Sequence, residues 1–367
     1  MNKLRAALIV LAVMCSGAVV IASSSTQQRA AQPASNKTDQ MVPMRDGIKL
    51  ATSISLPQGN GPWPVVLTRT PYNKDSMPAA GWISHGFAFV SQDVRGKFKS
   101  EGQYRPFLDD ANDGYDTIEW IAKQPWCSGK VGMFGASAMG IAANEASLAE
   151  PPHLTAMFVM VARASVYSQS AYMGGVFRAE LNDKWLEREH AEWVIQEELK
   201  HNDYDHYFDN AEMSLHWQQV QVPVYNYGGW YDIFNQGNVD DFAGLQEKGG
   251  GLAAGNQKLM MGPWGHGGLE EVHYPSNSAV NPQTEAMRWF DYWLKGIDNG
   301  IMSEPPVKYY VMGDVTDSKA PGNYWATAIS WPPQSRNTSY FLTAGGGLTR
   351  AIPGPEDSKD TYEYDPK

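Results

Sequence analysis

Apolar and polar residues form alternating short blocks between residues 41 and 164, and the period of the blocks changes along the chain. Compact apolar runs that end in polar residues are typical of buried strands. Between them lie stretches with apolar residues at helical spacing, one of which Pro125 ends. The pattern predicts strands at 63–72, 86–96, 130–135 and 154–162, and helices at 110–124 and 138–150. Such alternation predicts an α/β fold, a mostly parallel sheet with helices on both faces.

Residues 165–217 interrupt this alternation. They are aromatic, charged and mostly helical in pattern, and they contain no strand candidate. We therefore expect a helical cap, inserted between two core strands and lying over the sheet edge. The α/β pattern resumes in residues 218–302, so the core is expected to comprise residues 41–164 and 218–302. Its second part should contain strands within 222–234 and 257–266, ending before Asp232 and His266, and helices at 238–248 and 284–297.

The first forty residues differ from the rest. Lys3 and Arg5 precede an apolar run at 6–22, which is typical of a signal peptide (residues 1–22) cleaved before Ser23. An uncleaved membrane anchor is the alternative, because the run approaches the length needed to span a bilayer. Residues 23–40 have the composition of a disordered tether. The protein is thus predicted to be secreted or periplasmic, or else anchored by its N-terminal segment.

After Pro305 and Pro306 the pattern consists of short strands without helices. Residues 303–367 are therefore predicted to begin a C-terminal all-β, jelly-roll-like domain. They are fewer than the roughly 100 residues of a complete sandwich, so we expect a truncated domain. Its strands would lack partners and expose their edges.

Composition narrows the functional classes. With 43% hydrophobic residues, the 367-residue chain can bury a large core. Its formal net charge of −11 argues against nucleic acid as a partner. Removal of the signal segment would leave Cys127 as the one cysteine, so no internal disulfide is expected.

The stretch "GMFGASAMG", residues 132–140, places Ser137 among small residues between a predicted strand and a predicted helix. A nucleophilic serine in a strained strand–turn–helix needs such neighbours. The usual pattern is G-x-S-x-G, whereas here the second glycine comes one place late, at Gly140. Close packing of a helix on the sheet is the alternative explanation for the same residues.

Two further residues follow in the order that an α/β-hydrolase triad requires. Asp232 comes just after one predicted strand and His266 just after the next. Both lie at C-terminal strand ends, where ligands bind in α/β sheets. Alone, the aspartate could cap a helix and the histidine could belong to a loop. Together with Ser137 they predict a catalytic triad, in which a base activates the hydroxyl and an acid orients the base.

Six blocks in order extend this picture: "TRTPYNK", "SQDVRGKFKSEGQY", "DTIEWIAKQPWCSGKVGMFGAS", "NYGGWYDIF", "GPWGHG" and "RWFDYWLKGIDNGI". From about Met41 onward the chain resembles the cocaine-esterase (CocE/NonD-type) and X-prolyl dipeptidyl-peptidase family of α/β-hydrolases, which includes α-amino-acid ester hydrolases. The resemblance implies Ser137 as nucleophile, His266 as base and Asp232 as its orienting acid. It also implies an oxyanion hole formed by the Tyr72 hydroxyl and the Ala138 N–H. Members of the family usually carry tyrosine where this chain has Ala138, which alters the pocket wall, and they continue through a complete jelly-roll domain.

The sequence therefore predicts a secreted serine hydrolase acting on esters or amides of small or amino-acid-derived acyl groups, with esters favoured. The substrate partner would be a small molecule or a short peptide, a homo-oligomer stays open, and no metal or organic cofactor is needed. An Xaa-Pro dipeptidyl-peptidase is the closest alternative; it would need carboxylates for a substrate ammonium. A hydrolase-like binding protein without activity is the remote one. The cap carboxylates are Glu180, Asp183 and Glu187, and the candidate pocket residues, equally suited to the core, are Trp230, Tyr231 and Trp264.

Overall fold

The computed structural model describes residues 36–266, 273–343, 345–352, 354, 363 and 365. The predicted signal peptide and most of the predicted tether lie outside these residues. Strand β1 (Asn36–Pro43) begins inside the range predicted as a tether and pairs antiparallel with β2 (Lys49–Leu56), with Asn36 opposite Leu56. The tether prediction is therefore wrong for residues 36–40. Composition indicated a solvated segment, but a strand can be held by the backbone hydrogen bonds of its neighbour.

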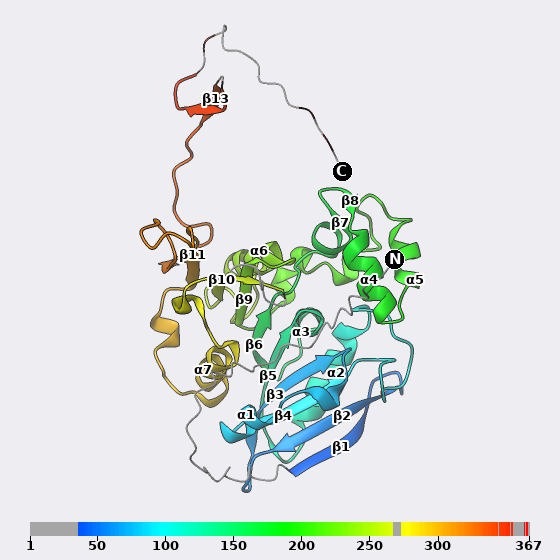
Figure 1. Ribbon diagram of the computed structural model, residues 1–367. Helices are drawn as coiled ribbons and strands as arrows, with labels where there is room; N and C mark the ends of the chain where they lie inside the picture. Colours follow the sequence, from blue (N-terminus) through cyan, green and yellow to red (C-terminus); the bar gives the residue numbers. More distant parts are fainter. Residues whose placement is uncertain are drawn as a thin grey trace, which may run out of the picture. The chain divides into compact units, whose positions relative to one another are not determined.

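A ten-stranded sheet forms the centre of the molecule, in the order β1-β2-β4-β3-β5-β6-β9-β10-β11-β12 (Figure 1). Strands from β4 through β11 in this order are parallel, and β1, β2 and β12 are antiparallel to their neighbours. The predicted, mostly parallel sheet is confirmed. The remaining strands of the sheet are β3 (Trp63–Thr70), β4 (Ala88–Asp93), β5 (Cys127–Ala136), β6 (Leu154–Met160), β9 (Val224–Tyr231), β10 (Lys258–Gly265), β11 (Val307–Val311) and β12 (Tyr324–Ala328).

Helices cover both faces of the sheet, as predicted (Figure 1). One face packs against α1 (Ala80–Ser84) and α7 (Pro282–Lys295), which contribute Trp82, Trp289 and Phe290 to an aromatic core. The opposite core is aliphatic, and the helices that complete it are α2 (Asp110–Ala122), α3 (Ala138–Leu148) and α6 (Asn235–Lys248). Together these two cores hold in place the strand ends beside which the predicted triad residues lie.

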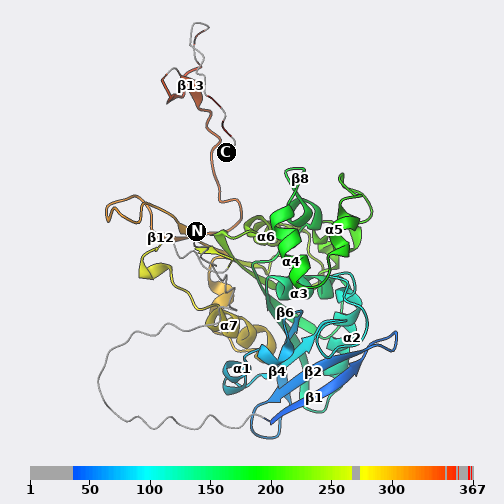
Figure 2. The ribbon, with the colours of Figure 1, turned by 45° about the vertical axis from the view of Figure 1, so that its right-hand side comes forward.

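The cap follows β6. Its helices α4 (Ala179–Arg188) and α5 (Trp193–Glu198) lie side by side in both views and share a small apolar cluster around Leu186 and Val194 (Figures 1 and 2). The cap also contains a two-stranded hairpin, β7 (Tyr172–Met173) and β8 (Val176–Phe177), although no strand was expected there. Two residues per strand are too few to produce a period-2 pattern. Single helical turns lie at Lys74–Ser76, Tyr167–Ala171, Asp209–Ala211, Met213–Leu215, Trp217–Gln219, Ser276–Ser278 and Ile301–Ser303.

The C-terminal boundary differs from the prediction. Strand β11 pairs parallel with β10 of the core sheet, and β12 pairs antiparallel with β11. The first compact unit accordingly extends to Ile329, and a second begins at Ser330. The expectation that the strands following Pro306 lack partners is wrong for these two, because β11 pairs with β10, which buries Val307 and Tyr310, and β12 pairs with β11. The second unit contains a separate antiparallel pair, β13 (Phe341–Thr343) with β14 (Gly347–Thr349).

Candidate active site

Ser137 occupies the turn between β5 and α3 in a backbone conformation that is unusual for a side-chain-bearing residue, with φ 56° and ψ −128°. Such strain persists where the surroundings hold it, and it is common at functional sites. The Ser137 N–H donates to the Met160 carbonyl oxygen at 3.0 Å, which ties the turn to β6. A Cβ at Gly135 would lie 2.3 Å from the Met139 carbonyl oxygen. The small residues are therefore needed to form the turn itself.

The three predicted triad residues meet at this turn. The Ser137 Oγ lies 2.7 Å from Nε2 of His266, and Nδ1 of the same ring lies 2.7 Å from Oδ2 of Asp232. An ionised carboxylate only accepts hydrogen bonds, so Nδ1 carries the proton and Nε2 is free to accept the serine proton. This is the arrangement in which an imidazole can act as a base toward a hydroxyl.

Asp232 is held from two sides. Its backbone N–H donates to the Gly229 carbonyl oxygen at 3.0 Å, and its Oδ1 accepts the Phe234 N–H at 2.6 Å. The carboxylate is fully buried, while 30% of the His266 side chain is exposed. The Phe234 ring lies edge-on to the imidazole, with the ring centroids 5.6 Å apart. The buried acid is thus fixed, while the base is partly exposed to solvent.

Tyr72 and Ala138 are the two predicted oxyanion donors. Ala138 is the first residue of α3, and the first N–H groups of a helix have no partner within the helix. Tyr72 follows the end of β3, where its N–H donates to Oγ1 of Thr70 at 2.9 Å. Burial raises the pKa of Tyr72, against smaller opposing effects of hydrogen bonds with Trp185 and Ser137. The phenol therefore keeps its proton and remains a donor.

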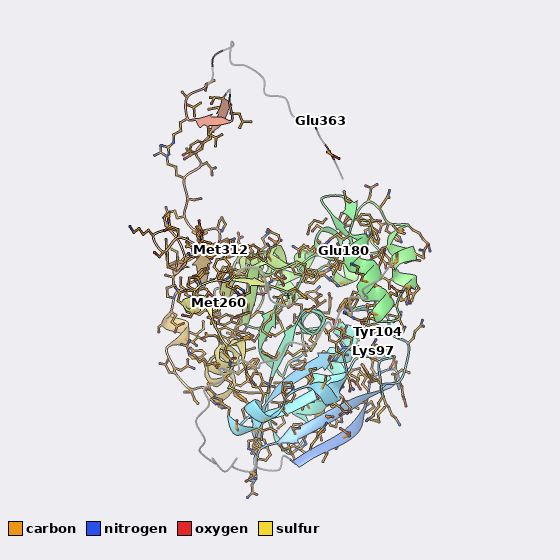
Figure 3. The ribbon with its side chains drawn as sticks, viewed as in Figure 1. Lys97, Tyr104, Glu180, Met260, Met312 and Glu363 are labelled. Atoms are coloured by element: carbon orange, nitrogen blue, oxygen red, sulfur yellow. The ribbon has the colours of Figure 1, made fainter. Side chains whose placement is uncertain are left out.

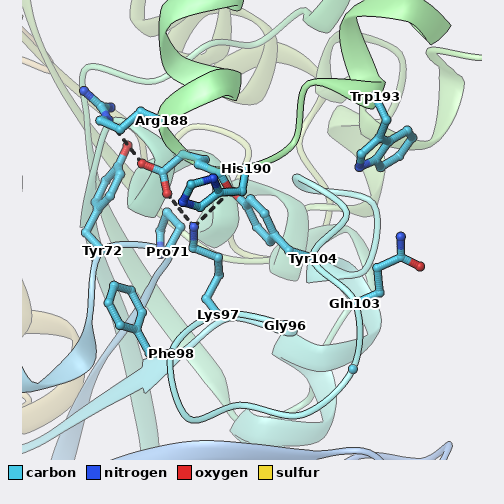
Figure 4. A pocket seen from close by; sticks show the side chains of 12 residues that line it. Pro71, Tyr72, Gly96, Lys97, Phe98, Gln103, Tyr104, Arg188, His190 and Trp193 are labelled. Atoms are coloured by element: carbon cyan, nitrogen blue, oxygen red, sulfur yellow. Dashed lines mark hydrogen bonds and ion pairs between the residues drawn. The ribbon is translucent and has the colours of Figure 1, made fainter.

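A cavity of about 740 Å³ lies between the cap and the loop that follows β4 (Figure 4). Tyr72 forms part of its wall, and Lys97 points from the loop toward the cap. The Lys97 Nζ lies 2.7 Å from the buried Glu189 carboxylate, which also accepts Arg188 Nε at 3.2 Å. The other lining residues are Pro71, Gly96, Phe98, Gly102, Gln103, Tyr104, His190 and Trp193.

The three aromatic residues predicted for the pocket do not line this cavity. The Trp230 Nε1 donates to the Tyr310 carbonyl oxygen at 2.8 Å, and the Trp264 ring stacks on Tyr227 with centroids 4.8 Å apart. The Tyr231 hydroxyl pairs with the Tyr274 hydroxyl at 2.7 Å. Their position beside the triad in sequence did not reveal that β11 joins the sheet next to them and that Tyr310 of β11 accepts the Trp230 N–H.

The cap carboxylates Glu180, Asp183 and Glu187 are all exposed on α4. Glu180 pairs with Lys184 on the same helix at 2.7 Å and lies apart from Lys97 and Tyr104 (Figure 3). The carboxylate that does reach the cavity is Glu189, one residue beyond the end of the helix. Spacing on a helix could not single it out, because its burial depends on the loop that supplies Lys97.

Within the described part of the chain, no group of three or more histidine, cysteine, aspartate or glutamate side chains is placed to hold a metal ion. Likewise, none of the helices in that part combines the length and the apolarity that crossing a bilayer requires.

Similarity to known proteins identifies the family of this chain. The model of the X-Pro dipeptidyl-peptidase (S15) family matches residues 46–191 and 181–268. The cocaine esterase of Rhodococcus sp. (strain MB1 Bresler) is 29% identical over 89% of this chain and 67% of its own length. Among solved structures, a CocE/NonD family hydrolase from Staphylococcus aureus is similar with a TM-score of 0.72 and 24% identity, over 85% of this chain and 59% of that one. An α-amino acid ester hydrolase has a TM-score of 0.71 at 22% identity, over 90% and 66%.

The chain thus spans between 59% and 67% of the length of these relatives. The structural likenesses, which are below 25% identity, show the shared fold, and the family model covers the segment that contains Ser137, Asp232 and His266. The chain belongs to the X-Pro dipeptidyl-peptidase (S15) family and has its α/β-hydrolase fold.

Proposed function

We propose that the protein is a secreted serine hydrolase that cleaves small carboxylic esters or amides through an acyl-enzyme. Ser137 attacks the carbonyl carbon while His266 takes the hydroxyl proton and passes it to the leaving group. Water then attacks the carbonyl carbon of the acyl-enzyme in the same way and releases the acid. Asp232 holds the imidazole, and the Tyr72 hydroxyl and Ala138 N–H stabilise the oxyanion.

The observation that carries this proposal is the pair of 2.7 Å contacts that link Ser137 to His266 and His266 to Asp232. A serine hydroxyl needs such a base and a group to orient it before it becomes a useful nucleophile. An inactive binding protein would have no need to hold a buried carboxylate against a histidine.

Esters are favoured over Xaa-Pro peptides by the charges around the cavity. A free peptide N-terminus would require an uncompensated carboxylate, whereas Glu189 already contacts Lys97 and Arg188. The exposed cap carboxylates are accessible to water, which weakens their attraction for an ammonium group. The dipeptidyl-peptidase reading nevertheless stays the alternative to test, because the family is named for that activity.

Covalent labelling of the whole chain by a fluorophosphonate tests the mechanism. We expect labelling of the wild type and none of Ser137→Ala, with a loss in kcat of about 10⁴- to 10⁶-fold. Ser147→Ala is the matched control, since Ser147 lies on the same helix and its hydroxyl bonds to the Asn144 carbonyl oxygen. Retention of more than a tenth of the activity by Ser137→Ala would show that Ser137 is not the nucleophile. A panel of nitrophenyl esters beside an Xaa-Pro anilide decides between the two substrate classes.

Secretion needs a separate measurement. Cleavage of the N-terminal segment predicts a mature protein that begins at Ser23, which N-terminal sequencing of the exported protein would reveal. Recovery of the full-length chain in the membrane fraction would instead support the anchored alternative.

A further inference from the structure

The cap makes a direct hydrogen bond to the tyrosine of the proposed oxyanion hole. The indole Nε1 of Trp185 donates to the Tyr72 hydroxyl oxygen at 2.9 Å. Trp185 lies on cap helix α4, and Tyr72 follows core strand β3, 113 residues earlier in the chain. The contact therefore links the cap to the core at the hydroxyl oxygen of the proposed oxyanion donor.

This contact restricts where the phenolic proton can point. An indole N–H is a donor only, so the Tyr72 oxygen must accept it, and the phenol's own proton has to be directed elsewhere. Burial raises the pKa of Tyr72 and keeps that proton in place. The phenolic proton is thus left for an acceptor other than the indole.

The indole is itself held in place. Its ring stacks on Phe107 with centroids 5.6 Å apart and an interplanar angle of 8°. The neighbouring Leu186 is buried in the small cluster between α4 and α5. The Trp185 carbonyl oxygen also accepts the Glu189 N–H at 2.9 Å, which continues the helical hydrogen bonding as far as Glu189 in the cavity wall.

We propose that Trp185 is a positioning residue that orients the Tyr72 hydroxyl toward the oxyanion. This role rests on the proposed function, because it requires Tyr72 to act as an oxyanion donor. A donor that is oriented before the reaction stabilises the transition state without reorganisation at the moment of attack. Loss of the indole N–H should therefore slow the chemical step and leave substrate binding unchanged.

Two variants remove the N–H while keeping an aromatic ring against Phe107. Trp185→Phe is the genetic one, and replacement of Trp185 by 3-benzothienylalanine, in which sulfur takes the place of the N–H, preserves the size of the ring system. We expect each to lower kcat for a nitrophenyl ester about fivefold to tenfold with KM within about twofold of the wild type. Trp217→Phe is the matched control, since the Trp217 indole N–H also donates to a side chain, that of Asp241 at 3.4 Å, but Trp217 does not line the cavity and the variant should keep full kcat.

A double-mutant cycle with Tyr72→Phe gives the decisive measurement. If Trp185 acts through the Tyr72 hydroxyl, its replacement should cost nothing further once that hydroxyl is gone. Equal losses in both backgrounds, or a raised KM with unchanged kcat, would overturn the proposal and mark Trp185 as a packing or substrate-contact residue. A full kcat in the benzothienylalanine variant would also overturn it. The proposed function would survive these outcomes as long as Ser137→Ala is inactive and Tyr72→Phe lowers kcat, so the two failures are distinguishable.

Discussion

Replacement of Asp232 by asparagine changes the hydrogen-bonding character of one buried oxygen while leaving the size of the side chain almost unchanged. One amide oxygen can still accept the Phe234 N–H, which now bonds Oδ1 at 2.6 Å. The amide nitrogen then faces Nδ1 of His266, 2.7 Å from the present carboxylate oxygen. Because an amide nitrogen donates, Nδ1 must accept, and the ring proton moves to Nε2.

The consequence falls on Ser137. With its proton on Nε2, the imidazole can no longer accept the serine proton across the 2.7 Å contact. The wrong tautomer in a triad lowers kcat by about 10⁴-fold, which corresponds to about 5 kcal/mol of transition-state stabilisation. Because the side chain keeps its size and one of its two acceptor contacts, we expect the loss in kcat with little change in KM.

Steady-state hydrolysis of a nitrophenyl ester at pH 7 measures kcat and KM, and thermal unfolding shows whether each variant is folded. Asp241→Asn is the matched control. Asp241 is also buried, that burial raises its pKa well above the usual value, and it lies outside the triad, where its Oδ2 accepts the Asn144 side-chain N–H at 3.0 Å. We expect the control to keep kcat within a few-fold of the wild type. A loss below about tenfold in Asp232→Asn would refute the tautomer argument, as would equal losses in the two variants.

Three further changes test other parts of the site. Tyr72→Phe deletes one oxyanion donor, so kcat should fall about 10²- to 10³-fold with modest change in KM; a defect in KM alone would make Tyr72 a binding residue. Gly135→Ala places a Cβ 2.3 Å from a backbone oxygen in the turn that carries the nucleophile, so both kcat and the melting temperature should fall. A kcat equal to that of the wild type would contradict this steric argument. Burial raises the pKa of Glu145 to about 8, against an ordinary value of 4.5. Between these two pH values the folded carboxyl holds a proton that the unfolded chain has released. The free energy of unfolding should therefore fall as pH rises, by up to about 1.4 kcal/mol per pH unit. Urea unfolding of Glu145→Gln should show a weaker dependence on pH than the wild type, and identical pH profiles would exclude this role.

Local pattern was sufficient for much of the core. Helix α2 begins at Asp110, as its spacing predicted, and ends before Pro125 because proline cannot continue the helix. The small residues around Ser137 predicted a strand–turn–helix, because any larger side chain would meet the backbone there. The chain order of serine, aspartate and histidine, each just beyond a predicted strand, anticipated that they would meet, since parallel strands bring their carboxyl ends to one edge of the sheet.

Tertiary contacts decided what lies around that triad. The short strands following Pro306 look alike in sequence, yet β11 and β12 extend the core sheet and β13 and β14 do not. The partner of a strand is chosen by the edge it reaches and the side chains it buries, neither of which is a property of the strand alone.

The same reason explains the cavity and its neighbours. Trp264 was a pocket candidate by its position in sequence, but its ring stacks on Tyr227 of the neighbouring strand. Trp185 carried no signal beyond helical amphipathicity, and its contact with Tyr72 exists because the cap folds back over β3. Residue types and their order thus determined which chemistry the chain could perform. The direction of each side chain around the nucleophile was decided by packing between segments more than a hundred residues apart.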